Sequence, residues 1–488
     1  MTMSSNDRTT PRIADTTGDT RAFPPGFLFG AATAAYQIEG AAHEDGRTDS
    51  IWDAFARVPG AVLDAHDGSV ACDHYHRYAD DVALMKDLGL DTYRFSTSWS
   101  RIQPDGGDVN RAGIDFYSRL VDAQLAAGIK PWLTLYHWDL PQALEEKGGW
   151  TNRDTAYLFR DYALNVYEAL GDRVDVWTTL NEPWCSSFLS YTAGVHAPGR
   201  QSRRDGLVSA HHLLLAHGLA VGALRERRPD LTLGITLNQT LPKPLDPENP
   251  ADVDAARRID GQFNRVFLDP VFRGEYPADV LEDVAEYGLL DVVRDGDMKI
   301  ISAPIDALGV NYYHGEIVSA TPAEGIPSGD APVVRPTSSP YPAADGVFNH
   351  PQDLPLTDMN WEVQPDGLRE VLARIHREYA GPAGVDLYVT ENGAAYDDVV
   401  AEDGQVHDAE RVAFLRAHLA AILDAIEQGV DVKGYFYWSL MDNYEWAWGY
   451  HKRFGIVRVE YDTQERTVKD SGREYAAIIA ARSLGTGA

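Results

Sequence analysis

Short apolar runs rich in β-branched and aromatic residues recur along the chain, separated by longer stretches in which apolar residues repeat every three or four positions. The first pattern is typical of buried β-strands and the second of amphipathic helices. Their alternation predicts βα units around a parallel sheet. The runs that predict strands are Phe27–Ala34, Asp91–Ser96, Lys130–His137, Val174–Asn181, Leu231–Asn238, Ala307–Tyr312, Asp386–Glu391 and Val432–Trp438.

The stretches between these runs have the marks of helices. Residues 114–125 carry apolar side chains at helical spacing and are followed by Gly128, and residues 159–170 do the same before Gly171. With no break rich in Pro, Gly or Ser between two halves, eight strands favour one closed (β/α)₈ TIM barrel over two doubly wound domains. We expect this domain to span residues 22–484, with the active site at the C-terminal ends of its strands.

One long stretch departs from the pattern. Residues 314–360, after the sixth predicted strand, are rich in Pro, Ser, Gly and Asp and show little periodicity. Insertions that follow a barrel strand lie on the face that holds the active site, which favours a rim-loop insertion at about 314–360. A flexible surface excursion fits the composition equally well, so both interpretations remain open.

Composition and charge bear on partners and compartment. The 488 residues carry a formal net charge of −31, which argues against nucleic acid or an anionic membrane surface as a partner. Residues 1–21 are polar and lack the apolar core of a signal peptide, so we expect a disordered N-terminal tail and a cytoplasmic protein. No uninterrupted apolar run is long enough to predict a transmembrane helix. Two cysteines, Cys72 and Cys185, provide neither a disulfide framework nor the spacing of a metal site.

Polar side chains collect at the C-terminal ends of the predicted strands. The fourth strand delivers Glu182 between Asn181 and a proline, and the seventh delivers Glu391 before an Asn-Gly pair. Because strand ends meet at one face of a barrel, these two strands can aim two carboxylates at one bond, which is the minimum needed to hydrolyse a glycosidic linkage. The amides, imidazole and indoles at other strand ends suit a hexose, with its hydroxyls and its apolar ring face.

Four motifs, in this order along the chain, resemble those of family 1 glycoside hydrolases, the β-glucosidase family of retaining (β/α)₈ barrels. They are FLFGAATAAYQIEG at 27–40, TLNEP at 179–183, VTENG at 389–393 and WSLMDNYEW at 438–446. The resemblance covers about residues 23–481. It implies a retaining β-glucosidase that removes terminal non-reducing β-D-glucosyl residues from small β-glucosides and cello-oligosaccharides through a covalent glycosyl–enzyme, with side activity on β-galactosides and β-fucosides.

The resemblance also implies roles for individual residues. Glu391 matches the nucleophile and Glu182 the acid/base, while Arg94 and Tyr313 match the groups that keep the nucleophile ionised. No cofactor is implied, and the only partner is a small-molecule β-glycoside. The residues that match the family's substrate-binding positions are Gln37, His137, Asn181, Asn311, Tyr313, Trp438, Glu445, Trp446 and Phe454.

Without the motifs, Trp438 and Trp446 would be interpreted as core packing. His137 could also be a core histidine, but its place at a strand end beside Trp138 favours contact with a ligand. A metal site is not expected, because the closest histidine pairs lack further ligands at matching strand ends; these pairs are His74 with His76, and His211 with His212.

Related specificities and activities can also be weighed. Enzymes of the family that cleave 6-phosphoglycosides carry Ser where this chain has Glu445. The carboxylate of Glu445 would repel a phosphate group. Lys452 matches a lysine of those enzymes, but Phe454 stands where they have a tyrosine. Thioglucosidases replace the acid/base by Gln, whereas Glu182 is present here. Two alternatives remain open: a transglycosylase that uses the same intermediate, and a non-catalytic sugar-binding barrel.

Overall fold

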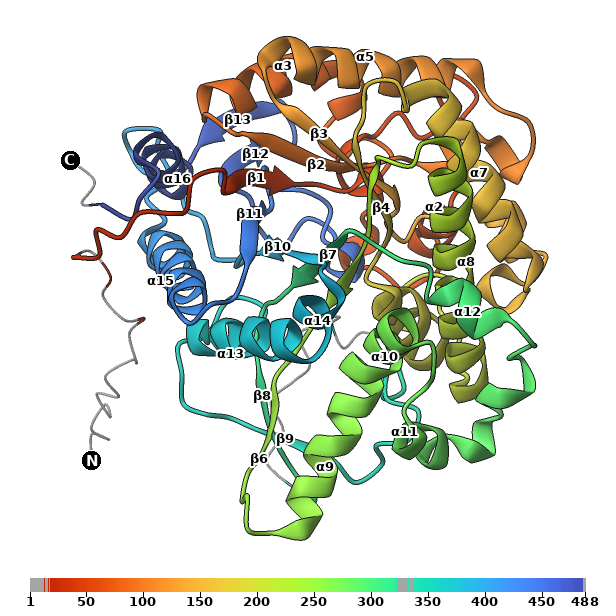
Figure 1. Cartoon of the computed structure of the whole chain (residues 1–488). Coiled ribbons are helices and arrows are strands. Elements are labelled where there is room, and N and C mark those ends of the chain that lie inside the picture. Colours follow the sequence, from red (N-terminus) through yellow and green to blue (C-terminus); the bar gives the residue numbers. More distant parts are fainter. Residues whose placement is uncertain (1–12, 14–15, 17, 323–331, 333–336, 486–488) are drawn as a thin grey trace, which may run out of the picture.

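The computed structural model describes residues 13, 16, 18–322, 332 and 337–485. Eight parallel strands form a closed barrel in the order β1-β11-β10-β7-β5-β4-β3-β2, at the centre of the molecule in Figure 1. The predicted (β/α)₈ barrel is confirmed, and each observed strand lies within one or two residues of a predicted run. The strands are β1 (Leu28–Ala32), β2 (Thr92–Ser96), β3 (Lys130–Tyr136), β4 (Val176–Asn181), β5 (Thr232–Asn238), β7 (Ala307–Asn311), β10 (Asp386–Asn392) and β11 (Val432–Trp438).

Helices surround the barrel, most of them between successive strands (Figure 1). They are α1 (Ala35–Ile38), α2 (Ile51–Ala56), α3 (His74–Asp87), α4 (Trp99–Ile102), α5 (Arg111–Ala127), α6 (Gln142–Glu145), α7 (Asp154–Leu170), α8 (Arg203–Arg227), α9 (Pro250–Asp260), α10 (Val266–Arg273), α11 (Ala278–Asp283), α12 (Asp297–Ile301), α13 (Pro365–Ile375), α14 (Gly381–Ala383), α15 (Ala409–Glu427) and α16 (Asp470–Ala481). Short 3₁₀ or π segments are η1 (Leu63–Ala65), η2 (Pro104–Gly106), η3 (Gly149–Thr151), η4 (Cys185–Ala193), η5 (Gly261–Arg265), η6 (Ala285–Tyr287), η7 (Leu289–Asp291), η8 (His376–Ala380) and η9 (Trp446–Trp448).

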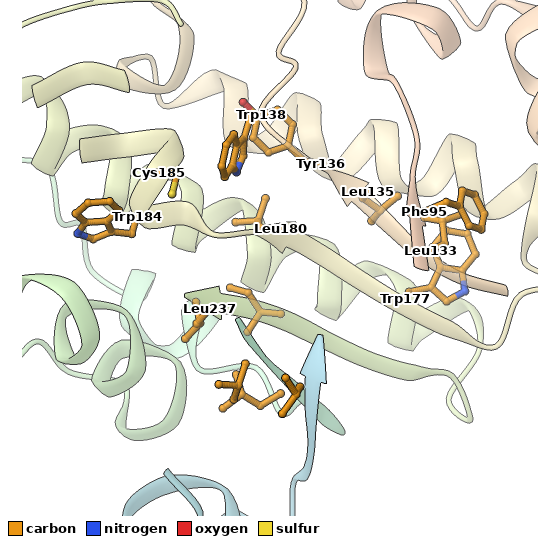
Figure 2. Packing of buried hydrophobic residues seen from close by; sticks show 14 of the residues in the cluster. Phe95, Leu133, Leu135, Tyr136, Trp138, Trp177, Leu180, Trp184, Cys185 and Leu237 are labelled. Atoms are coloured by element: carbon orange, nitrogen blue, oxygen red, sulfur yellow. The ribbon is translucent and has the colours of Figure 1, made fainter. Parts of the chain in front are cut away.

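The core lies in the barrel and between the barrel and its helices. β2 and β7 are buried at every position, as expected for parallel strands that are covered on both faces. Figure 2 shows part of this core, with Phe95, Leu133, Trp177 and Leu237 contributed by four neighbouring strands. The helix α5 turns its apolar stripe inward and ends where Gly128 adopts a left-handed conformation with φ 81°, which ordinary side chains disfavour.

The longest helix, α8, is long and apolar enough to cross a membrane by length and composition alone. An apolar 18-residue window of it is 83% buried inside the protein, so it packs as a core helix. The sequence analysis did not single it out because its apolar residues are interrupted by polar ones, such as His211 and His217. Those histidines are themselves buried and hydrogen-bonded, to Asp297 and Thr179 respectively.

The predicted insertion and tail are only partly within the described residues. In the 314–360 segment, β8 (Glu316–Ser319) and β9 (Phe348–His350) join β6 (Pro242–Pro244) in a small sheet next to α9, at the bottom of Figure 1. Most of the 1–21 tail lies outside the described residues. Within its described part, the Arg21 guanidinium donates to the Asp424 carboxylate at 2.6 Å. The backbone of residues 21–23 pairs with that of residues 482–484.

Candidate active site

A cavity of about 370 Å³ opens where the strands end. Its lining includes His137 after β3, Glu182 after β4, Asn311 at the end of β7, Glu391 on β10 and Trp438 at the end of β11. Five separate strands therefore deliver side chains to one space at the C-terminal face of the barrel. This is the face on which TIM barrels hold their active sites.

The backbone is irregular where the two glutamates emerge. The pairing register shifts between Val389 and Glu391 on β10, and between Thr178 and Asn181 on β4. Bulges of this kind turn a side chain toward a site. Glu182 itself has a φ of 46°, a left-handed conformation that is uncommon for a residue with a side chain and that recurs at functional sites.

Glu391 is 3% exposed and is held by a cation and a phenol. Arg94 donates from Nη1 to Oε1 at 2.6 Å, and Tyr313 donates its hydroxyl to Oε2 at 2.8 Å. Burial is the largest influence and raises the pKa of Glu391, and Arg94 and Tyr313 oppose it because both favour the carboxylate. The sequence-based prediction placed these two residues beside Glu391, and the structure brings all three together.

Glu182 is equally buried, at 4% exposed, but its partners are uncharged. Asn311 donates from Nδ2 to Oε1 at 2.7 Å, and Cys185 donates its thiol to Oε2 at 3.1 Å. Burial and the negative charge of Glu391 raise the pKa of Glu182 to about 8. Of the pair Glu182 and Glu391, Glu182 is therefore the one that keeps a proton at neutral pH.

A chain of hydrogen bonds joins the two glutamates. Arg94, which bonds to Glu391, also donates from Nη2 to Oδ1 of Asn181 at 2.6 Å. The same Oδ1 accepts from Nδ2 of Asn311 at 3.2 Å, and that Nδ2 also donates to Glu182. Because all five side chains are buried and mutually bonded, their positions relative to one another are fixed before any ligand arrives.

Three buried polar atoms on the predicted substrate-binding residues lack a hydrogen-bond partner within the described part of the chain: Gln37 Oε1, His137 Nδ1 and Glu445 Oε2. Such atoms are costly to bury, so they indicate a polar ligand. Gln37 uses its amide nitrogen on Asn443 Oδ1 at 3.0 Å and on the Tyr444 carbonyl at 2.8 Å, which leaves Oε1 as an acceptor.

His137 and Glu445 provide a donor and a second acceptor in addition to Gln37 Oε1. His137 Nε2 accepts from Asn181 Nδ2 at 3.0 Å, and burial keeps the pKa of His137 well below its usual value. The ring is thus neutral with its proton on Nδ1, which is a donor. Burial and the charges of Glu391 and Glu182 raise the pKa of Glu445 to about 8, so that this carboxyl both donates and accepts at neutral pH.

Aromatic rings form the wall of the inner cavity. His137 stacks on Trp438 at 5.7 Å and on Trp446 at 6.0 Å between ring centroids. Phe454 meets Tyr313 edge-on at 6.2 Å. All of these residues line the cavity. Of the predicted site residues, Gln37, Arg94 and Asn181 are not among the residues that line the cavity. Arg94 and Asn181 bond to lining residues, to Glu391 and His137 respectively.

The loop that carries Glu445 is anchored by buried charges. Asp442 accepts from Lys469 and from Arg453, each at 2.7 Å, and Lys469 also contacts Asp398. Asp442 and Lys469 are fully buried. Removing one member of such a group leaves an uncompensated charge in the interior, so the group holds the loop firmly.

The outer cavity contains residues that sequence reasoning missed. Trp184, just after Glu182, packs on Phe263 at 4.4 Å and on Tyr341 at 5.9 Å between ring centroids, and Trp361 packs on Tyr313 at 5.2 Å. All of them line the cavity, together with much of the described part of residues 314–360. The adjacency of Trp184 to the glutamate motif was the one usable signal, since the other three lie outside the predicted strands.

One group of side chains with metal-ligand chemistry also escaped the sequence analysis. Asp64, His66 and His451 meet at the surface, with His451 Nε2 at 2.8 Å from Asp64 Oδ2. His66 Nδ1, however, accepts a hydrogen bond from the Tyr450 backbone N–H at 3.2 Å. The proton of the neutral ring then sits on Nε2, which makes that nitrogen a poor ligand.

Comparison with known proteins agrees with this geometry. A sequence model of glycosyl hydrolase family 1 matches residues 19–484. β-Glucosidase A of Thermotoga maritima is 46% identical over 465 residues, which cover 95% of this chain and 98% of that protein. A bifunctional β-D-glucosidase/β-D-fucosidase of Bifidobacterium breve is 47% identical over 477 residues, covering 95% of this chain and 99% of that protein.

Solved structures give the same result. A psychrophilic β-glucosidase from Micrococcus antarcticus superposes with a TM-score of 0.93 at 56% identity, covering 95% of this chain and 98% of that one. The β-glucosidase of Thermotoga maritima in complex with castanospermine has a TM-score of 0.87 at 44% identity, covering 96% of this chain and 100% of that one. With its barrel, its paired glutamates and these relatives, the chain belongs to glycosyl hydrolase family 1.

Proposed function

We propose that this protein is a retaining β-glucosidase that hydrolyses terminal β-D-glucosyl residues of small β-glucosides. The observation that carries the proposal is the pair of buried glutamates at one cavity, Glu391 beside a cation and Glu182 beside neutral donors. A retaining glycosidase needs one carboxylate as nucleophile and one carboxylic acid as proton donor. The relatives named β-glucosidase, at 43–48% identity, support the same activity.

In the first step, Glu391 attacks the anomeric carbon while Glu182 gives its proton to the departing glycosidic oxygen. Arg94 and Tyr313 hold Glu391 in its ionised form and in place for the attack. The C–O bond to the aglycone breaks, an ester forms between the sugar and Glu391, and Glu182 is left as a carboxylate. The alcohol leaves neutral because it has taken up that proton.

In the second step, the same groups exchange tasks. The ester removes the negative charge of Glu391, which is one of the two causes that raise the pKa of Glu182. The pKa of Glu182 therefore falls, and its carboxylate accepts a proton from water as the water attacks the anomeric carbon. The two displacements together retain the β configuration. In free enzyme, kcat/KM falls as pH rises through about 8, because Glu182 then loses the proton it must donate.

Sugar recognition follows from the unpaired atoms. Gln37 Oε1 accepts from a hydroxyl, His137 Nδ1 donates to one, and Glu445 does either. Trp438 offers a flat face to the apolar side of the ring. By its match to the family, Asn181, next to the acid/base, contacts the 2-hydroxyl, and this contact strengthens as positive charge develops on the sugar. A small-molecule sugar is the substrate class that these groups fit.

The proposed substrate range includes β-fucosides but not phosphorylated sugars. The relative from Bifidobacterium breve is named for β-fucosidase as well as β-glucosidase activity, so we include β-fucosides. A phosphorylated sugar is disfavoured, because Glu445 occupies the position at which the family's 6-phosphoglycosidases carry Ser, and because Lys452 is engaged elsewhere. The Lys452 ammonium donates to the Asp358 carbonyl at 2.6 Å and lies 4.7 Å from the Trp448 ring centroid.

The test is a panel of nitrophenyl β-glycosides, with NMR to identify the first anomer released. We expect release from the β-glucoside and β-fucoside, with β-glucose appearing first. The Glu391→Ala variant serves as the inactive control. Initial formation of α-glucose would contradict the retaining mechanism, and failure of the wild type to release nitrophenol from any β-glycoside would contradict the proposed function.

A further inference from the structure

The acid/base candidate has a neighbour that the two-carboxylate mechanism does not use. Cys185, three residues after Glu182 and the first residue of η4, donates its thiol to Glu182 Oε2 at 3.1 Å. Its backbone N–H also donates to the Glu182 carbonyl at 3.0 Å, so the same residue contacts both the main chain and the side chain of Glu182. Figure 2 shows Cys185 next to Trp184, just beyond the end of β4. Both residues line the cavity.

The surroundings of the sulfur orient its proton. Asn238, at the end of β5, donates from Nδ2 to Cys185 Sγ at 3.8 Å, so the sulfur is an acceptor on that side. The thiol hydrogen is then directed to Glu182 Oε2. Oε1 of the same carboxyl group accepts from Asn311 at 2.7 Å. The two oxygens thus have one donor each, and the plane of the carboxyl group is fixed at both ends.

The two donors differ in strength, and that difference has a consequence for catalysis. Donors to a carboxylate stabilise its ionised form in proportion to their strength. A thiol is a weak donor, whereas an amide or hydroxyl is a strong one. With two strong donors, Glu182 would be well oriented but ionised. With one strong and one weak donor, it is oriented and still able to keep its proton.

We propose that Cys185 is a positioning residue for the acid/base Glu182, whose thiol orients the carboxyl group with a donor weak enough to leave it protonated before catalysis. This inference rests on the proposed function, because it requires Glu182 to be the acid/base. The thiol keeps its own proton throughout. The proton given to the aglycone is that of Glu182, and the S–H bond only strengthens its hydrogen bond while Glu182 is a carboxylate.

Three substitutions separate donor strength from packing. Cys185→Ser supplies a stronger donor, Cys185→Ala removes the donor and some volume, and Cys185→Val removes the donor while approximately preserving the volume. The readout is the pH profile of kcat/KM on phenyl β-glucoside, whose poor leaving group requires the acid. We expect the alkaline limb to move down by about half a pH unit in Cys185→Ser and up by about half a unit in both Cys185→Ala and Cys185→Val.

A second substrate and a second cysteine supply the controls. On 2,4-dinitrophenyl β-glucoside, which departs without protonation, we expect the three variants to differ in kcat/KM by less than about twofold. Cys72 is the matched control, since its thiol also donates at 3.1 Å, but to the Asp442 carbonyl. We expect Cys72→Ser to leave the alkaline limb in place. Circular dichroism and melting curves confirm that each variant is folded.

The outcomes are distinct. Opposite shifts for Ser and for the Ala–Val pair support the inference. If Cys185 only packs, Ser and Ala shift the limb alike or not at all, and the inference is overturned while the proposed function stands. A wild-type enzyme that hydrolyses neither glucoside overturns the proposed function, and this inference with it. If one variant does not fold, the other two still test the inference. A pair that includes Cys185→Ser should move the alkaline limb in opposite directions, and the pair Cys185→Ala and Cys185→Val should move it by the same amount to higher pH.

Discussion

The ends of β4 and β10 present the same side chain in two different settings. Glu182 and Glu391 are both glutamates, are both almost fully buried and share one hydrogen-bonded network. At β10 the carboxyl group meets a guanidinium and a phenol, whereas at β4 it meets an amide and a thiol. Burial alone would raise both pKa values together. The partners therefore divide the roles, because a cation favours the buried carboxylate more strongly than neutral donors do.

The largest expected effect comes from removing the nucleophile. Glu391→Ala leaves no group to form the ester, so kcat/KM on nitrophenyl β-glucoside should fall on the order of 10⁴-fold or more. Azide should restore turnover in this variant and give the α-glucosyl azide, since it attacks from the side vacated by Glu391. The exposed Glu427→Ala is the matched control, with activity expected within twofold. A β-azide product would reverse the assignment of the two glutamates.

Removing the acid/base should have a smaller effect that depends on the substrate. For Glu182→Ala we expect a loss on the order of 10³-fold in kcat/KM with phenyl β-glucoside and a much smaller loss with 2,4-dinitrophenyl β-glucoside. Acid assistance matters only where the leaving group is poor. Azide should here yield the β-glucosyl azide, by attack on the glycosyl–enzyme. Equal losses on both substrates would argue that Glu182 is not the proton donor.

Removing the cation tests the comparison directly. Arg94 lowers the pKa of Glu391, so Arg94→Met raises it. Because the nucleophile must be ionised, the acid limb of the kcat/KM profile moves to higher pH, and activity at the optimum falls about 10²-fold. Tyr313→Phe, which removes a neutral donor, should shift the limb in the same direction by less. An acid limb unchanged in Arg94→Met would show that the guanidinium does not set the ionisation of Glu391.

The smallest effect is expected from a substitution at a residue that contacts neither Glu182 nor Glu391. Asn443 accepts from Gln37 at 3.0 Å and helps to aim Oε1 of Gln37 at the sugar. Asn443→Ala should lower kcat/KM about tenfold, mainly through KM, because the Tyr444 carbonyl still holds the amide. Both limbs of the pH profile should stay in place. A shifted limb would mean that the ionisation of the glutamates depends on this sugar-binding group as well.

The barrel could be predicted from the sequence because its strands are short, apolar and rich in β-branched residues, and because parallel strands leave an unambiguous alternation with helices. Strand ends were less predictable. β1 stops at Ala32, although the apolar run continues to Ala34, because the chain turns into α1 at that point. The part of the site formed by strand-end residues could be predicted once the barrel was predicted, because residues at the C-terminal ends of the strands converge on one face.

The outer site could not be predicted in the same way. Phe263 and Tyr341 pack on each other and on Trp184, whereas Trp361 packs on Tyr313, so these segments are held by contacts between distant parts of the chain. The strands β8 and β9 were missed because they are only four and three residues long, which is too short to show an alternating pattern. β8 pairs with β9 on one side and with the proline-containing β6 on the other. The left-handed backbone at Glu182 also has no local signal, because the sequence there offers no glycine to mark it.

The indoles that wall the inner cavity have an experimental consequence. Trp438 and Trp446 are each 4% exposed, and both stack on His137, which lines the cavity with them. A sugar that binds against Trp438 displaces water from the face of the indole and changes the polarity around the indole ring. The intrinsic fluorescence of the protein should therefore report occupancy of the site without any attached dye, and an inactive Glu391→Ala enzyme would allow affinities to be titrated by light emission alone.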